Sequence, residues 1–115
     1  MDRDQGIQEL LEFMAPFRAS MSEWYVGTTH EPYRRIFNDH RVPPDYKAHT
    51  CLVVESADTA RAIESFFLEN VKTDGGQGGG DENSRFVYAF LKTNGTYPPL
   101  GRGAGARAGR RGPRF

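Results

Sequence analysis

The spacing of apolar residues predicts two long amphipathic helices. In residues 4–19 the apolar positions recur every three or four residues, which gives one continuous stripe along a helix. Asp4 is the candidate cap of this helix, and Pro16 weakens its end. Residues 56–71 show the same period, with Ser56 at the expected N-cap. The stripes consist of Ile7, Leu10, Leu11, Met14 and Phe17 in the first helix and of Ala60, Ile63, Phe67 and Val71 in the second.

Three short segments have the composition of β-strands. Residues 23–27 (EWYVG) stop at a glycine, residues 49–55 (HTCLVVE) are β-branched and apolar, and residues 85–93 (RFVYAFLKT) are aromatic and apolar. Between the first two strands the pattern predicts a helix over residues 32–40, with a proline in its first turn, and a loop over 41–48. We therefore expect an α+β fold, with a small three-stranded, largely antiparallel sheet flanked by two or three helices.

The distribution of charge divides the chain into a body and a tail. Residues 1–100 hold 10 basic and 15 acidic side chains, a net charge of −5, and we expect them to form one domain. Residues 101–115 hold five arginines and no acid, and we expect a disordered Arg/Gly-rich tail, with little order beyond the segment NGTYPPLG (94–101). The acidic body does not favour sequence-blind phosphate binding, whereas the tail either contacts a polyanion or is a passive end.

The cysteine count and the hydropathy point to an intracellular, soluble protein. Cys51 is the only cysteine, so no intrachain disulfide forms, and its apolar neighbours predict a buried side chain. The first residues lack the apolar run of a signal peptide, and no stretch approaches 18 apolar residues. We expect no contact with a membrane.

Three polar residues in a fixed order suggest a catalytic site. Tyr25 lies in the segment WYVG, Arg35 follows the glycine of that segment by eight positions, and Glu64 ends the segment LVVESADTARAIE, four positions after an alanine. This ordered set resembles the GIY-YIG nuclease family over about residues 24–70. WYVG corresponds to the second half of the family's name motif, and the last segment to its third strand and the following A-x-x-x-E helix.

The resemblance implies particular roles for these residues. In the family the arginine is catalytic and the glutamate holds one divalent metal, so we expect Glu64 to bind Mg²⁺ (or Mn²⁺) and Arg35 to stabilise the phosphate. A carboxylate suits such a hard cation, and a guanidinium fits a phosphate without losing its charge. A tyrosine hydroxyl at position 25 would position or activate the nucleophile. His40 resembles the histidine that often ends the arginine helix, displaced by one residue, and is a secondary candidate for placing a proton or phosphate.

The first strand of the family, which carries GIY, has no counterpart before residue 23. The segment RFVYAF (85–90) resembles it, so we expect Tyr88 to stand beside Tyr25 through a circular rearrangement in which the last strand pairs with the first. Finding the two tyrosines on non-adjacent strands would contradict this expectation. The late asparagine of the family has no clear counterpart.

The leading hypothesis is a metal-dependent endonuclease-like domain that cleaves a nucleic-acid phosphodiester, with DNA favoured over RNA. The alternative is a non-catalytic GIY-YIG-like interaction module, favoured by the acidic body and the missing first strand. Arg35 and Glu64 then belong to solvated helix faces, and Tyr25 and Tyr88 to the core. The segment DGGQGGGDE (74–82) follows a helix and contains acids, which favours a connection over a phosphate-binding loop and leaves a structural metal on its acids open.

Overall fold

The structure, a computed structural model, describes residues 1–76 and 81–102. Its four strands form one sheet in the order β2-β4-β1-β3. The strands are β1 (Trp24–Thr29), β2 (His49–Val53), β3 (Asp74–Gly75) and β4 (Phe86–Leu91), and the two main helices are α1 (Arg3–Met14) and α2 (Ala57–Phe66). The expected α+β class is confirmed.

The predicted three-stranded sheet is wrong in one respect, because the sheet has a fourth strand and is mixed. β1, β2 and β4 are the three predicted strands, and β4 pairs antiparallel with both β1 and β2. β3 pairs parallel with β1 at Tyr25 and Val26. This strand has only two residues and lies at the start of the glycine-rich segment, so it has no alternation of apolar residues that a sequence pattern could reveal.

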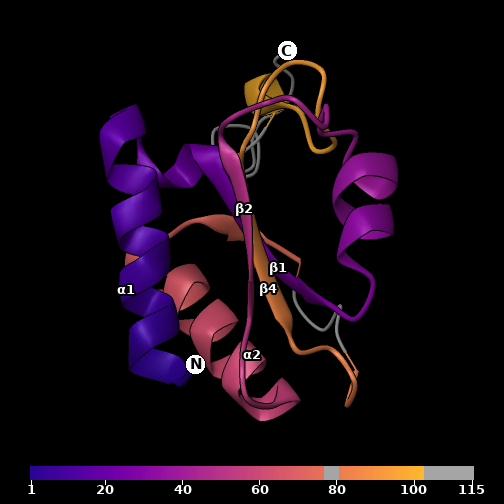
Figure 1. The fold of residues 1–115 in the computed structure, drawn as a ribbon. Helices are drawn as coiled ribbons and strands as arrows, with labels where there is room; N and C mark the ends of the chain where they lie inside the picture. The colour runs from indigo at the N-terminus through magenta and orange to yellow at the C-terminus, as the bar shows by residue number, and fades with distance from the viewer. Residues whose placement is uncertain (77–80, 103–115) are drawn as a thin grey trace.

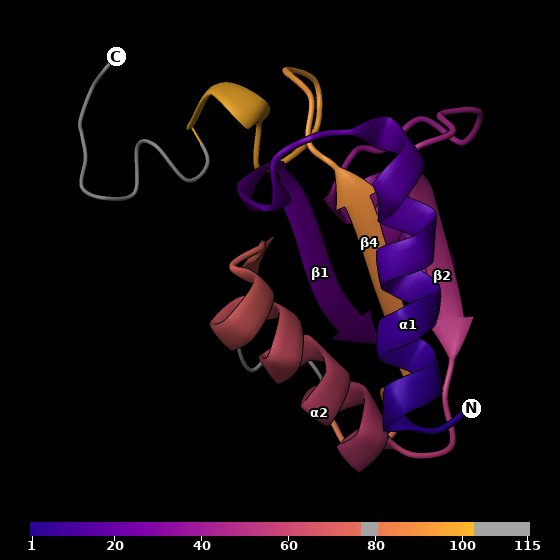
Figure 2. The same ribbon diagram turned by 90° about the vertical axis from the view of Figure 1, so that its left-hand side faces the viewer.

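Helices cover both faces of the sheet (Figure 1). α1 and α2 lie on one face, where α1 crosses β4 and β2 and α2 lies toward β1 (Figure 2). The opposite face is covered by a π-helix, η3 (Arg34–Asp39). Because side chains alternate along a strand, Val26 and Val87 belong to the core beneath α1 and α2, whereas Tyr88 and Phe90 belong to the core beneath η3.

The helix termini follow local capping rules, with one correction to the sequence prediction. Asp2, not Asp4, caps α1, and it forms a reciprocal capping box with Gln5. The helix ends at Met14 and continues as a 3₁₀ turn that contains Pro16, because a proline cannot donate the next helical hydrogen bond. Ser56 caps α2 as predicted, and α2 then passes into a π-helical turn, η4 (Phe67–Val71).

The first two residues of the predicted tail, 101 and 102, belong to a 3₁₀ turn, η5 (Leu100–Arg102). Residues 94–100 before them form an ordered loop after β4. Their backbone is fixed by hydrogen bonds from Leu100 N to Thr93 O (2.8 Å) and from Tyr97 N to His40 O (2.9 Å). The second bond ties this loop to the end of η3. The rest of the predicted tail, residues 103–115, lies outside the described residues, and no helix of the described part is long and apolar enough to cross a membrane.

Candidate functional site

Three of the predicted site residues meet on the face of the sheet that η3 covers. Tyr25 of β1 and Tyr88 of β4 stack with their ring centroids 6.2 Å apart and an angle of 17° between the planes. The imidazole of His40, just after η3, lies 4.6 Å from the Tyr25 ring and 5.3 Å from the Tyr88 ring. β1 and β4 are adjacent antiparallel strands, so the two tyrosines stand side by side.

His40 makes hydrogen bonds through both ring nitrogens. Its Nδ1 lies 2.7 Å from the carbonyl oxygen of Tyr97, and its Nε2 lies 2.7 Å from the hydroxyl of Tyr88. A carbonyl oxygen can only accept, so Nδ1 carries the proton and Nε2 accepts from the Tyr88 hydroxyl. The Tyr25 ring stacks on the Tyr88 ring, so the phenol of Tyr25 lies beside this hydrogen-bonded pair. A directed chain of donors therefore runs from the Tyr88 hydroxyl to His40 and from His40 to the Tyr97 carbonyl.

Two glycines make room for the tyrosine hydroxyls. A Cβ atom at Gly27 would lie 2.6 Å from the hydroxyl oxygen of Tyr88, and one at Gly76 would lie 2.6 Å from that of Tyr25. Both distances are far below van der Waals contact, so any side chain at these positions would displace the hydroxyl. The glycine that ends WYVG thus serves the position of Tyr88.

Burial keeps the two phenols and the imidazole neutral near pH 7. Loss of hydration is the main reason that the pKa of Tyr25 is raised to about 12, and the nearby carboxylates of Asp74 and Glu64 raise it further. Burial likewise raises the pKa of Tyr88 and lowers the pKa of His40 from its usual 6.5. The hydroxyls therefore act as hydrogen-bond donors and acceptors, and Nε2 of His40 retains a lone pair that can take a proton.

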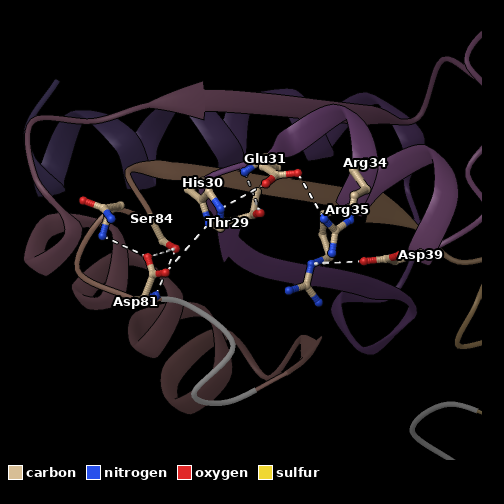
Figure 3. A network of polar contacts seen from close by, with 9 residues as sticks. Thr29, His30, Glu31, Arg34, Arg35, Asp39, Asp81 and Ser84 are labelled. Carbon is tan, nitrogen blue, oxygen red and sulfur yellow. Dashed lines mark hydrogen bonds and ion pairs between the residues drawn. The ribbon is translucent and has the colours of Figure 1, made fainter.

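Arg35 adds a positive charge to this group. Its charge lowers the pKa values of Tyr25, Tyr88 and His40. Its Nε lies 3.6 Å from a carboxylate oxygen of Asp39, one turn later in η3, and Figure 3 shows the two terminal nitrogens pointing away from that carboxylate. The Arg35 side chain is 37% exposed, so a ligand in solvent can reach it. The ion pair with Asp39 holds the Arg35 side chain in place while the side chain stays partly exposed, and both properties suit contact with a phosphate.

Glu64 of α2 is a buried carboxylate with an unsatisfied oxygen. The residue is 6% exposed, and its Oε2 has no hydrogen-bond partner among the described residues. Loss of hydration raises the pKa of Glu64 to about 7, against a smaller opposing effect of Arg61. The charge of Glu64 raises the pKa values of Tyr25 and Tyr88, so it acts on the same two hydroxyls as Arg35. In the described part of the chain, no ion pair joins Glu64 to Arg35.

The described residues form no ready-made metal cage, and Glu64 is the single carboxylate expected to hold a cation. Within residues 1–76 and 81–102, no three His, Cys, Asp or Glu side chains cluster as a metal site. Mg²⁺ binds through one or two carboxylates, and the unpartnered Oε2 of Glu64 is a candidate for one such ligand. The acids of the glycine-rich segment have other partners: Asp74 lies 3.0 Å from the ammonium of Lys92, and Asp81 accepts from the Ser84 hydroxyl. The alternative of a structural metal on these acids gains no support.

A network of exposed polar side chains borders the site (Figure 3). His30, at the end of β1, lies 3.2 Å from a carboxylate oxygen of Glu31 and 3.9 Å from one of Asp81. Arg34 lies 3.2 Å from the other carboxylate oxygen of Glu31. Hydrogen bonds from the Asn83 backbone and the Ser84 side chain lower the pKa of Asp81. The ion pairs of this network connect the start of η3 to the turn before β4. They therefore orient the first turn of η3, while the charged side chains in them stay exposed.

Several functional groups could not be found from the sequence. The carbonyl of Tyr97 is a backbone group in the loop after β4, so no side-chain property identifies it. Lys92 and Asp74 form an ion pair in which the two side chains are only 0% and 9% exposed, although the sequence places Lys92 at the polar end of a strand. Asp39, by contrast, could have been found from the sequence, because it follows Arg35 by four positions, the spacing typical of ion pairs in a helix.

One sequence prediction near the site needs correction. Cys51 of β2 was expected to be buried, but it is only half-buried, because β2 is an edge strand and its side chain borders solvent beside η3. Burial is still sufficient to raise the pKa of its thiol to about 11. The thiol is therefore protonated and unreactive near pH 7.

Comparison with protein-family models, with curated proteins and with solved structures gives no match for this chain. Its function has to be inferred from the geometry of these side chains.

Proposed function

We propose that the chain is a metal-dependent endonuclease-like domain of GIY-YIG type that cleaves a nucleic-acid phosphodiester, with DNA as the first substrate to test. The proposal rests on one observation. The Tyr88 hydroxyl is hydrogen-bonded to His40, the Tyr25 ring packs against both of their rings, and the charges of Arg35 and Glu64 both act on the two phenols. These residues come from β1, β4, the end of η3, η3 itself and α2. A core formed only for packing has no need to direct three polar side chains and two charges to one place.

The directed hydrogen bonds give each group a role in hydrolysis. A water bound at the Tyr88 oxygen would transfer a proton through the hydroxyl to Nε2 of His40, while the water oxygen attacks the phosphorus and one ester P–O bond breaks. The departing oxygen would take a proton from solvent. His40 becomes an imidazolium, stabilised by its Nδ1–H bond to the Tyr97 carbonyl. Arg35 neutralises charge that develops on the phosphate, and one such preorganised donor contributes on the order of 3 kcal/mol in other enzymes. Tyr25 packs against the rings of Tyr88 and His40 and would hold them in place.

Glu64 is the residue that would hold the cation. Its buried oxygen lacks a partner, and the high pKa of its carboxyl group means that ionisation without a counter-charge is unfavourable. When bound, a divalent cation supplies Lewis-acid stabilisation to the phosphate and the leaving oxygen.

A nicking assay with paired variants tests the proposal. Supercoiled plasmid and labelled single strands are incubated with Mg²⁺ or Mn²⁺ and the wild-type chain, or with Glu64→Gln or Arg35→Ala. The matched controls are Glu69→Gln, an exposed acid in the next helical turn, and Arg34→Ala, the exposed neighbour. We expect nicking by the wild type and both controls, with loss in both site variants. Equal nicking by all five proteins would indicate a contaminating nuclease and would refute the proposal.

The second candidate is a non-catalytic interaction module with the same fold. It is favoured by the lack of a multi-ligand metal cluster among the described residues and by the net charge of −5 over residues 1–100. This candidate predicts no metal-dependent cleavage with any substrate and no effect of Mg²⁺ on the thermal stability of the wild-type chain.

A further inference from the structure

An aromatic pocket lies on the flank of η3 that faces away from Arg35. It is a cavity of about 270 Å³ between η3 and the edge strand β2, and its walls include Tyr33, Phe37 and His49. Ile36, which is buried, and Cys51, which is half-buried, also line it. None of the side chains that make up the catalytic proposal lines this cavity.

The walls of the pocket are rings. The Tyr33 and Phe37 centroids are 5.5 Å apart with the planes tilted by 46°, and Phe37 meets His49 edge-on, with centroids 5.4 Å apart and an angle of 83°. Tyr33 is 80% exposed, the largest exposed fraction among the exposed large hydrophobic side chains of the described residues. An aromatic ring held in solvent beside an apolar cavity offers a stacking surface for a flat ligand.

The size of the cavity limits the ligand to one small ring system. Its volume lies just below the range of about 300–1,000 Å³ that is typical of sites for drug-sized molecules. A nucleobase is flat and aromatic, and it stacks on protein rings without regard to sequence. A base inside a duplex is not accessible to such a pocket, because both of its faces are covered by neighbouring base pairs.

The position of the pocket connects it to the proposed phosphate contact. Tyr33 and Phe37 lie four positions apart on one flank of η3, and Arg35 lies between them in sequence on the other flank, beside Asp39. A helix with its side chains is about 10 Å across. A strand with one phosphate at Arg35 can therefore bring a neighbouring base around η3 to the pocket.

We infer that the pocket formed by Tyr33, Phe37 and His49 binds one unpaired nucleobase of a single-stranded or extrahelical segment, next to the scissile phosphate. The inference rests on the proposed function, because the phosphate contact at Arg35 identifies the ligand as a nucleic acid. It adds a preference for substrates with an unpaired base, which the catalytic residues do not specify.

Binding measurements test the pocket separately from cleavage. The probes are a fluorescein-labelled 12-nucleotide DNA single strand and a strand of the same length that is abasic at every position, titrated in EDTA so that no metal-dependent cleavage occurs, with anisotropy as the readout. Tyr33→Ala removes the ring, Tyr33→Leu keeps apolar volume without a ring, and Tyr33→Phe keeps the ring. The residue is exposed, so all three variants should fold, which circular dichroism verifies. A parallel titration uses an extended apolar peptide, because β2 is an edge strand.

Loss of one base stack weakens binding by roughly 5- to 100-fold. We expect a loss in that range for Tyr33→Ala and Tyr33→Leu, with Tyr33→Phe close to the wild type, and the loss should shrink when the abasic strand has no base to place in the pocket. The inference is overturned by equal affinity of the wild type and Tyr33→Ala, by Tyr33→Leu binding as well as the wild type, by no DNA binding at all, or by tight binding of the peptide alone.

The two proposals fail in different ways. Ring-dependent binding of DNA without any nicking would refute the endonuclease and leave the base pocket intact. Cleavage of the labelled single strand that requires Glu64 but is unaffected by Tyr33→Ala would refute the pocket and leave the endonuclease intact.

Discussion

Replacing Glu64 by glutamine should make the protein more stable at pH 8. The pKa of Glu64 rises from its usual 4.5 to about 7 in the folded chain, because the carboxylate loses hydration and has no compensating partner. One unit of pKa corresponds to about 1.36 kcal/mol, so the ionised carboxylate destabilises the fold by about 3 kcal/mol well above pH 7. Glutamine has a similar volume and no charge, and it should recover most of this free energy.

The sign of the effect follows from proton binding. Below pH 4.5 the carboxyl group is protonated in both the folded and the unfolded chain, so no penalty exists. Between pH 4.5 and about 7 the unfolded chain has released the proton while the folded chain retains it, and stability falls as pH rises. Above this window the penalty is constant. The difference in unfolding free energy between Glu64→Gln and the wild type should therefore grow by about 2–3 kcal/mol from pH 5 to pH 8.

Urea unfolding at pH 5 and pH 8, followed by the fluorescence of Trp24, measures this difference. Glu69→Gln is the control, because this exposed acid on the following helical turn should give the same difference at both pH values. Millimolar Mg²⁺ at pH 8 should stabilise the wild type and leave Glu64→Gln unchanged, since only a cation that binds the folded state shifts the equilibrium. A difference between Glu64→Gln and the wild type that does not change with pH would show that Glu64 ionises in the fold without cost, and the argument for an unsatisfied carboxylate would fail.

Three further outcomes follow from other contacts. Arg35→Lys keeps the charge but loses the planar fork, and it should reduce plasmid nicking by at least about tenfold, or 1.4 kcal/mol; nicking at the wild-type rate would exclude a forked phosphate contact. Tyr88→Phe leaves Nε2 of His40 without its donor, and it should lower the urea-unfolding free energy by about 1–3 kcal/mol and abolish nicking; an unchanged rate would remove the hydroxyl from the mechanism. Lys92→Met removes a buried partner of Asp74 and should destabilise the protein by about 3–5 kcal/mol in the same assay. The double variant with Asp74→Asn should recover part of this loss. A loss below about 1 kcal/mol would mean that water already screens the ion pair.

The elements that depend on local pattern were predictable. The apolar stripe in residues 56–71 and the Ser56 cap predicted α2, since helical period and capping are properties of neighbouring residues. The three longer strands followed from β-branched and aromatic composition. β3 could not be predicted in this way, because a two-residue strand is defined by its partner β1 and not by its own side chains. The π-helical form of η3 could not be predicted either, because apolar residues spaced with a 3.6-residue period indicate a helix without distinguishing a π-helix from an α-helix.

The candidate site was predictable as a set of residues but not as a network. Motif spacing selected Tyr25, Arg35 and Glu64, and the similarity of two strands placed Tyr88 beside Tyr25. Hydrogen-bond direction could not be obtained from spacing, since it depends on the carbonyl at position 97 and on the loop that carries it. The burial that raises the pKa of Glu64 also arises from tertiary packing, and the sequence permitted an exposed acid at that position equally well.

Because the Tyr88 hydroxyl lies so close to Gly27, the residues at these two positions constrain each other during evolution. A lineage that retains the hydroxyl has to keep glycine across the strand pair, because any larger residue would occupy the same space. Once the hydroxyl is lost, nothing in this contact preserves the glycine, and drift can replace it. The pair of residues found at these two positions in a homologue would therefore distinguish chains still selected for a working hydroxyl from those in which that selection has ended.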